Sequence, residues 1–242
     1  PVDIETTTME GMPMISIIGL GDQAVKEAGE RIRAAVDACG YVFPKKKIII
    51  NLAPGDKKKK GTHFDLAMAI SLLQHESAIG ARDLVNYGMI GELSLNGMLR
   101  PCRGIISMII AAKKSGMQNI IVPKSNLREA KLVHGIKVWG FENLIEVIRF
   151  LEGKAVADQN QTDISNENDL YEESTLDFKD VKGQDDLIEA VVLAAAGGHN
   201  MLMIGEPGCG KTMIAQRIPT ILPEMTKEES LEVTKIYSIC GL

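Results

Sequence analysis

The chain has 242 residues, of which 45% are hydrophobic and 24% charged, a length and composition that fit two modest domains of an ordinary α/β protein. No apolar run approaches the roughly 20 residues that cross a bilayer, and the polar residues 1–5 do not resemble a signal peptide. The 4 cysteines include no C-x-x-C pair, which argues against a zinc site or a disulfide framework. We therefore expect a cytoplasmic protein without a membrane partner.

The net charge of −5 is concentrated in one segment. Residues 153–176 hold one lysine against 6 acidic residues, whereas the remainder has 26 basic and 26 acidic residues. Because 153–175 is polar and lacks an apolar period, we predict an acidic flexible linker there, between a first domain at 1–152 and a second part at 176–242. Acidity confined to a linker does not argue against a nucleic-acid partner.

Apolar periodicity predicts alternating elements in the first domain, which together make a mixed sheet with helices, an α/β or α+β fold. Asp22 is a predicted helix cap, and Asn96-Gly97 is the predicted turn of a hairpin. Strands are predicted at 14–19, 47–52, 88–95, 98–101, 119–122 and 136–139, and helices at 22–38, 63–74, 104–115, 125–132 and 142–151.

The second part contains a pattern with direct chemical meaning. A helix predicted at 185–196 is followed by an apolar run at 200–204 that suits a buried strand, and residues 213–218 suit a helix. Between strand and helix stands a complete G-x-x-x-x-G-K-S/T phosphate loop, made of Gly205, Glu206, Pro207, Gly208, Cys209, Gly210, Lys211 and Thr212.

This loop predicts ATP and Mg²⁺ as cofactors. Glycines let backbone N–H groups converge on phosphate oxygens, and the following helix N-terminus adds partial positive charge. Lys211 is the predicted contact to the β- and γ-phosphates, and the Thr212 hydroxyl the predicted Mg²⁺ ligand. We interpret Cys209, at an x position of the loop, as a tolerated small residue rather than a redox switch.

Two basic runs flank the strand predicted at 47–52. One run precedes the strand and the other follows Pro54-Gly55, so the strand carries positive charge at both ends. Solvated loops are one interpretation of such runs, and a contact surface for the DNA backbone is the other. The residues concerned are Lys45, Lys46, Lys47, Lys57, Lys58, Lys59 and Lys60.

Several motifs resemble those of the magnesium-chelatase-like AAA+ ATPases. In the second part these are 182–184, 194–200, the phosphate loop, 219–223 and 231–238, and in the first domain 51–54, 64–69 and 91–101 resemble the Lon-protease-like domain of the YifB/ComM branch. The resemblance covers essentially the whole chain. It implies a Lon-protease-like N-terminal domain followed by the start of a P-loop AAA+ domain.

The resemblance also implies a function. Members of this family are expected to form homo-hexameric rings, and the ComM members to act as DNA helicases in branch migration during transformation and recombination. Because family members continue beyond Leu242, the Walker B acid, the sensors and the arginine finger are expected outside this chain, which alone should hydrolyse no ATP above background. The alternatives are a chelatase-type motor that remodels a metal-inserting partner, and a non-catalytic binding or oligomerisation module.

The Lon fold cleaves peptides with a Ser–Lys pair. Thr62 is the one hydroxyl residue at 61–63, where His63 stands in the place expected for serine, and residues 106–108, where the lysine is expected, read Ile-Ser-Met. We therefore expect no peptidase activity from this domain. His63 and Asp65 are interpreted as a helix-start pair rather than a catalytic dyad, since an acidic residue in the first turn suits the helix dipole.

Overall fold

The computed structural model describes residues 1–80, 84–154 and 176–241. The chain divides into two compact units, residues 1–161 with 230–242 and residues 162–229, each of which is described by itself. The predicted linker at 153–175 falls almost wholly outside the described residues, so it and the domain boundaries drawn from it stay predictions. In chain order the elements are β1 (Asp3–Met9), β2 (Met14–Ile18), α1 (Gln23–Ala38), β3 (Lys47–Ala53), α2 (Asp65–His75), β4 (Tyr87–Met89), β5 (Glu92–Leu93), β6 (Leu99–Arg100), α3 (Ile105–Lys114), β7 (Asn119–Pro123), η1 (Lys124–Asn126), α4 (Leu127–Ala130), β8 (Lys137–Phe141), α5 (Leu144–Leu151), η2 (Phe178–Asp180), α6 (Asp185–Gly197), α7 (Lys211–Arg217), η3 (Ile218–Ile221) and α8 (Lys227–Cys240).

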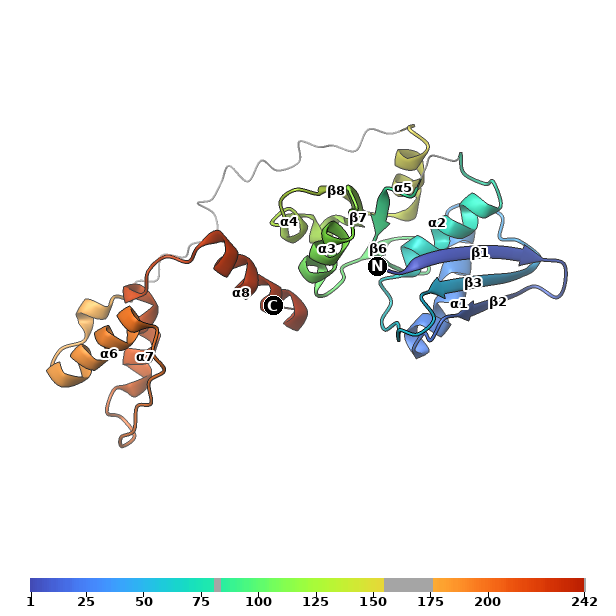
Figure 1. The fold of residues 1–242 in the computed structure, drawn as a ribbon. Coiled ribbons are helices and arrows are strands. Elements are labelled where there is room, and N and C mark those ends of the chain that lie inside the picture. The colour runs from blue at the N-terminus through green and yellow to red at the C-terminus, as the bar shows by residue number, and fades with distance from the viewer. Residues whose placement is uncertain (81–83, 155–175, 242) are drawn as a thin grey trace. The chain divides into compact units, whose positions relative to one another are not determined.

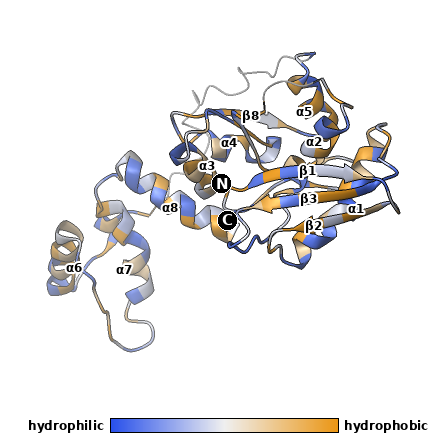
Figure 2. Cartoon of the chain, turned by 45° about the vertical axis from the view of Figure 1, so that its right-hand side comes forward, coloured by the Kyte–Doolittle hydropathy of each residue, from blue (hydrophilic) through white to orange (hydrophobic). Residues whose placement is uncertain are grey.

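The first sheet is built around β3, in the order β1-β3-β2 (Figure 1). β3 pairs antiparallel with β1 and parallel with β2. Alternate residues of β3, namely Ile48, Ile50 and Leu52, are completely buried, as expected for a strand with one face on the core. The isoleucine-rich run thus places one apolar face against the helices, and Figure 2 shows the apolar character of this strand.

Helices α1 and α2 cover the inner face of this sheet. α1 starts where predicted, because the Asp22 carboxylate accepts a hydrogen bond from the Val25 N–H at 3.0 Å, a side-chain N-cap. Its buried residues recur at helical spacing, and those of α2 pack on the same core. The residues concerned are Val25, Ala28, Ile32, Ala35 and Val36 in α1, and Leu66, Ala69, Ile70 and Leu73 in α2.

A second sheet, in the order β4-β7-β8, is parallel throughout. α3 packs on it in a core that includes Ile105, Ile109, Ile120 and Val122. The mixed α/β class predicted from the sequence is therefore confirmed. No helix in the described part of the chain is both long enough and apolar enough to cross a membrane.

The prediction of a hairpin at 88–101 was wrong in the length of its strands. β5 and β6 pair across the Asn96-Gly97 turn as predicted, but the hairpin takes in two residues on each side. Residues Tyr87–Met89 instead form a separate strand, β4, that pairs with β7. The chain leaves the sheet at Gly91, whose N–H donates to the His63 carbonyl at 3.0 Å. The segment predicted as one strand at 88–95 is therefore divided between two sheets.

The strand β1 was not predicted. Its burial alternates strictly, but the inward positions Ile4, Thr6 and Thr8 include only one large apolar side chain. Thr6 and Thr8 instead hydrogen-bond to side chains of α2 and its C-cap, Thr6 to Ser71 at 2.8 Å and Thr8 to Glu76 at 2.9 Å. An edge strand held by hydroxyl contacts therefore has no hydrophobic pattern to reveal it.

The second unit has a small core of Phe178, Val181, Val191 and Ile214. The helices predicted near 185–196 and 213–218 are present as α6 and α7. The strand predicted at 200–204 is not formed, because none of the described residues pairs with it, and Leu202 and Ile204 remain 82% and 88% exposed. An isolated apolar segment gains neither ladder hydrogen bonds nor a buried face, so its strand propensity is not realised.

Candidate nucleotide site

The phosphate loop leads directly into α7. Gly210 is the residue that caps this helix, and both Gly208 (φ +85°) and Gly210 (φ +87°) adopt the left-handed conformation that other residues avoid. A Cβ atom at Gly208 would meet nothing within 4 Å, so glycine is required there by backbone conformation and not by crowding. The first N–H groups of α7 have no partner within the helix and are available to an anion.

Lys211 folds back over the loop. Its Nζ donates to the carbonyl oxygens of Gly205 and Glu206, each at 2.8 Å, and contacts the Cys209 Sγ at 3.3 Å. The ammonium group therefore lies within the concave side of the turn, held by three atoms of the loop itself. The three acceptor residues are exposed. Lys211 can therefore exchange these contacts for phosphate oxygens without leaving a buried acceptor unpaired.

The start of α6 lies beside the loop. The Gln184 side-chain amide donates to the Cys209 carbonyl at 3.5 Å, and Gln184 itself has a positive φ of 63°. On the other side Ile214 buries α7 against the small core, and the Phe178 N–H donates to the Thr220 hydroxyl at 3.0 Å. The sequence motif at 182–184 did not reveal that Gln184 contacts the loop, because its positive φ has no sequence signal.

The residues of the loop fit a nucleotide phosphate in type and order. Left-handed glycines, an ammonium group that lies against the loop and the exposed Thr212 in the first turn of α7 are the parts such a site uses. No group of three His, Cys, Asp or Glu in the described ranges is placed to hold a metal ion, so a magnesium ion here would depend on Thr212 together with nucleotide oxygens.

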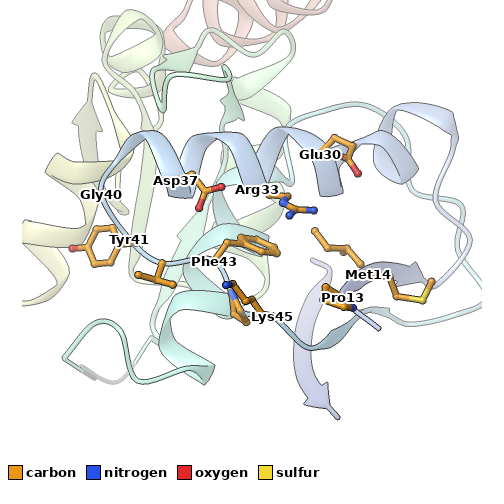
Figure 3. Close-up of a pocket in the computed structure, with 12 residues that line it drawn as sticks. Pro13, Met14, Glu30, Arg33, Asp37, Gly40, Tyr41, Phe43 and Lys45 are labelled. Carbon is orange, nitrogen blue, oxygen red and sulfur yellow. The ribbon is translucent and has the colours of Figure 1, made fainter. Parts of the chain in front are cut away.

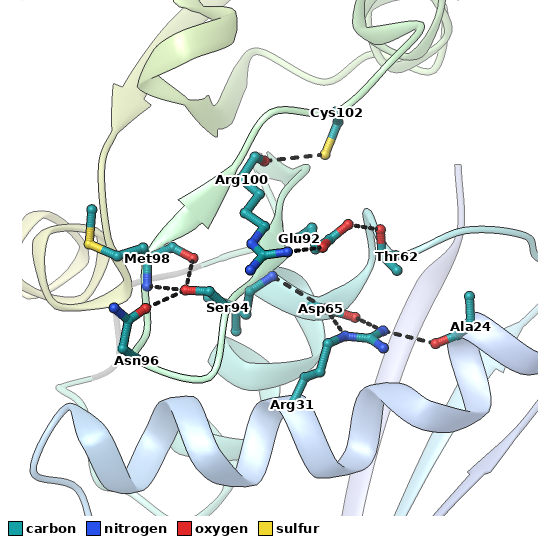
Figure 4. A network of polar contacts seen from close by, with 11 residues as sticks. Ala24, Arg31, Thr62, Asp65, Glu92, Ser94, Asn96, Met98, Arg100 and Cys102 are labelled. Atoms are coloured by element: carbon teal, nitrogen blue, oxygen red, sulfur yellow. Dashed lines mark hydrogen bonds and ion pairs between the residues drawn. The ribbon is translucent and has the colours of Figure 1, made fainter.

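The positions that correspond to a Lon catalytic pair hold a different contact (Figure 4). The Thr62 hydroxyl donates to the Glu92 carboxylate, and Arg100 Nη1 lies 3.6 Å from the other Glu92 oxygen. In α3, residues 106–108, where the lysine is expected, hold no lysine, and Ile106 is completely buried. The Thr62 hydroxyl is thus hydrogen-bonded to the Glu92 carboxylate, which is paired with Arg100. A Lon-type nucleophile would instead need a lysine amine beside the hydroxyl to activate it.

Asp65 has a structural partner that the sequence analysis did not identify. It lies in the first turn of α2, is completely buried, and forms a bidentate pair with Arg31 (Figure 4). Burial raises the pKa of Asp65, and the Arg31 guanidinium opposes that rise. Burial lowers the pKa of the neighbouring His63, which the charge of Asp22 opposes.

The two basic runs lie at opposite ends of β3, and one lysine departs from the prediction. Lys59 is only 2% exposed, and its ammonium donates to the Pro54 carbonyl. Its backbone is also tied down, because the Lys59 N–H donates to the Leu20 carbonyl at 3.0 Å. Lys59 therefore does not belong to a contact surface. The exposed members of the two runs are Lys45, Lys46, Lys57, Lys58 and Lys60, and Lys47 is half-buried in β3.

An open cavity of about 760 Å³ adjoins the first run (Figure 3). Arg33 and Lys45 line it, and the Arg33 guanidinium lies 5.6 Å from the centre of the Phe43 ring, a cation–π contact. Glu30 and Asp37 line the same cavity, so its charges are mixed and favour neither an anionic nor a cationic ligand.

The loop at the start of α7 and the mixed α/β domain that precedes it define a class of protein, the phosphate-loop proteins. Residues 4–126 match the family model described as subunit ChlI of Mg-chelatase, and residues 177–242 match the model described as magnesium chelatase, subunit ChlI. The chain belongs to this magnesium-chelatase-like AAA+ family, in its YifB/ComM branch.

Curated relatives support the assignment. The chain is 41% identical over 239 residues to the uncharacterized protein YifB of Escherichia coli, covering 99% of this chain and 46% of that protein. It is 38% identical over 245 residues to the competence protein ComM of Haemophilus influenzae, covering 98% of this chain and 47% of that protein. A Lon protease of Protochlamydia amoebophila is 32% identical over 123 residues, which are 48% of this chain and 14% of the protease. The chain thus spans about half the length of the YifB and ComM relatives.

Proposed function

We propose that this protein binds MgATP at residues 205–212 and belongs to a motor that acts on DNA. The observation that carries the proposal is the phosphate loop, in which two left-handed glycines and the Lys211 ammonium stand at the start of α7. MgATP supplies the free energy of phosphoanhydride cleavage when bound. The loop N–H groups hold the phosphates, Lys211 neutralises them, and Thr212 provides the magnesium ligand.

The DNA-acting part of the proposal has two supports. One relative is named a competence protein, ComM, and the resemblance to the ComM branch implies an action on DNA. In addition, the two ends of β3 carry exposed lysines whose charge suits a phosphate backbone. On this basis we propose branch migration of recombination intermediates by a homo-hexameric ring.

A second candidate is a chelatase-type motor that remodels a metal-inserting partner. The names of both matching family models favour it, since each refers to magnesium chelatase. The Lon-like domain at the N-terminus favours the DNA motor instead. Both candidates use the same nucleotide site, so they differ in the partner and not in the chemistry of the loop.

The experiment is a branch-migration assay on a synthetic four-way DNA junction with the full-length protein, with and without ATP. ATP-dependent migration that is lost in Lys211→Ala and kept in Cys209→Ala supports the DNA motor. ATP hydrolysis that no DNA stimulates, together with no migration, would favour the chelatase-type motor. Titration with a fluorescent ATP analogue in the presence of Mg²⁺ tests the loop separately, and binding unaffected by Lys211→Ala would refute the site.

A further inference from the structure

The charge of the first unit is unevenly distributed along the chain. Residues 101–141 contain one acidic residue, Glu129, against the basic residues Arg103, Lys113, Lys114, Lys124, Arg128, Lys131 and Lys137. The overall net charge of −5 hides this segment completely. Because the basic residues come singly or in one pair, they form no run that sequence inspection would single out.

The fold brings four of these lysines to one end of the second sheet. Lys113 and Lys114 end α3, and the Lys113 Nζ donates to the His134 carbonyl at 2.7 Å, in the turn between α4 and β8. Lys131 caps α4 at the beginning of that turn, and Lys137 starts β8 beside the segment that follows α3, its N–H donating to the Gln118 carbonyl at 2.9 Å. We call Lys113, Lys114, Lys131 and Lys137 the α3–β8 surface. Figure 1 shows α3, α4 and β8 grouped together.

Three of the four lysines of this surface face solvent. Lys113, Lys114 and Lys137 are exposed, and none of the three takes part in an ion pair with another described residue. The nearby carboxylate of Glu129 is half-buried and accepts a hydrogen bond from the Asn126 amide at 3.3 Å. By contrast, Lys124 of the same segment is already paired with Glu142 at 2.7 Å.

Helix dipoles explain only part of this arrangement. Lysines in the last turn of α3 and at the end of α4 are favourable to the dipoles, by roughly 0.3–1 kcal/mol each. Lys137 begins a strand and gains nothing from a helix dipole. The same end of the fold therefore gathers more positive charge than the local helix ends require.

The chemistry of the surface selects its partner. Interfaces with proteins rely on large apolar or aromatic anchors, yet Leu132, at 40% exposed, is the one large apolar side chain among residues 113–137 to be so exposed. Exposed lysines amid polar groups such as Gln118 and Ser115 instead suit a phosphate backbone, where binding comes from neutralised phosphates and released counterions.

We infer that the α3–β8 surface is a second contact site for the nucleic-acid backbone, separate from the lysine runs at the two ends of β3. The inference rests on the proposed DNA-acting function. The sequence suggested DNA binding only by the consecutive lysine runs. The inference adds a contribution from lysines that are separated in the sequence between residues 113 and 137. The contact is sequence-independent, because lysines that bind phosphates do not read bases.

The test uses a triple variant of the full-length protein, Lys113→Ala, Lys114→Ala and Lys137→Ala. The matched control removes the same number of charges from the same unit, as Lys26→Ala, Lys124→Ala and Lys154→Ala, of which the last two disrupt existing ion pairs. Binding of fluorescein-labelled single-stranded and duplex DNA is followed by anisotropy between about 50 and about 200 mM salt. A lysine-to-arginine triple at 113, 114 and 137 preserves the charge, and thermal melts verify that each variant is folded.

We expect the test triple to lower the salt dependence of DNA binding by about 2–3 in the log–log slope, with an affinity at least tenfold weaker at the lowest salt. The control and the arginine triple should keep the wild-type slope. A wild-type protein that binds no DNA would refute the DNA-acting function itself. Wild-type binding with equal slopes in test triple and control would refute only the α3–β8 surface. Loss of binding to anionic lipid vesicles, with DNA binding unchanged, would also overturn the inference.

Discussion

Arg31 and Asp65 fasten α1 to α2 through a bidentate ion pair, with Nε 2.7 Å from one carboxylate oxygen and Nη2 3.0 Å from the other. The same guanidinium donates to the Ala24 carbonyl at 2.8 Å, and the same carboxylate accepts from the Leu93 N–H at 3.3 Å. A single completely buried carboxylate therefore joins two helices and the β5–β6 hairpin.

Removing Arg31 should be strongly destabilising. Arg31→Met leaves Asp65 buried without its cation, at a cost of about 3–5 kcal/mol in the free energy of unfolding. Urea denaturation measures the loss, and Arg33→Met is the matched control because Arg33 is exposed and lies over Phe43. The double variant Arg31→Met with Asp65→Asn should recover much of the stability, since the amide oxygen still accepts from Leu93. Equal losses in Arg31→Met and Arg33→Met would contradict this account.

The turn at Gly97 offers a comparison between two glycines of the same conformation. Gly97 and Gly116 have φ angles of 81° and 84°, but a Cβ at Gly97 would lie 2.6 Å from the Cys39 Sγ, whereas one at Gly116 would meet nothing within 4 Å. Gly116→Ala should therefore cost only the backbone strain of about 1–2 kcal/mol. Gly97→Ala adds a steric clash and should cost measurably more in chemical denaturation. Equal destabilisation of the two variants would show that the Cys39 contact is relieved without cost.

The buried Cys102 thiol should make stability fall at high pH. Burial raises the pKa of this thiol from its ordinary value of 9.0 to about 11. The folded state thus keeps the thiol protonated while the unfolded chain ionises it, so the contribution to stability is complete below pH 9.0 and is lost progressively as the pH rises to about 11.

Over that window the loss attributable to Cys102 should be about 2–3 kcal/mol. Other groups also titrate there, so the measurement is the difference between wild type and Cys102→Ala in urea unfolding at a series of pH values. The difference should shrink steadily as the pH rises through this range. A difference that stays constant would mean that the thiol ionises alike in both states.

The phosphate loop should tolerate change at Cys209 and not at Gly210. Alanine at Gly210 would have to adopt a φ of +87°, at a strain of about 1–2 kcal/mol that weakens nucleotide binding roughly tenfold or more. Cys209→Ala removes only a sulfur contact with Lys211 and should leave affinity within about a factor of three. Titration with a fluorescent ATP analogue distinguishes the two, and a large loss in Cys209→Ala would give the thiol a role in the site.

Elements with a local signal were predicted well. α1 has its Asp22 cap and a periodic apolar face, and β3 has an isoleucine alternation, so both follow from neighbouring residues alone. The phosphate loop was also recognised from consecutive residues; of its two left-handed glycines, Gly210 is a glycine of the pattern, whereas Gly208 stands at an x position. The pairing of β4 with β7 could not be predicted, because it depends on a strand some thirty residues away and on Gly91 leaving the sheet.

Features that depend on distant contacts had no sequence signal. Lys59 looks like its neighbours in a lysine run, yet the Pro54 carbonyl and the backbone of Leu20 hold it inside the fold. The residues at 200–204 have strand propensity, but a strand exists only where another strand pairs with it. The α3–β8 surface escaped notice for the opposite reason, since its lysines gather only when α3, α4 and β8 are in place.

The position of β1 has a consequence for solubility. It covers one side of β3, whose sequence Lys-Ile-Ile-Ile-Asn-Leu-Ala would otherwise be an apolar sheet edge open to pairing with other chains. β1 itself presents threonines and acidic residues, which discourage further strand addition. By pairing with β3, the first nine residues prevent other chains from adding to this sheet edge. A protein shortened beyond Met9 should therefore precipitate or form β-rich assemblies under conditions in which its helices are still folded.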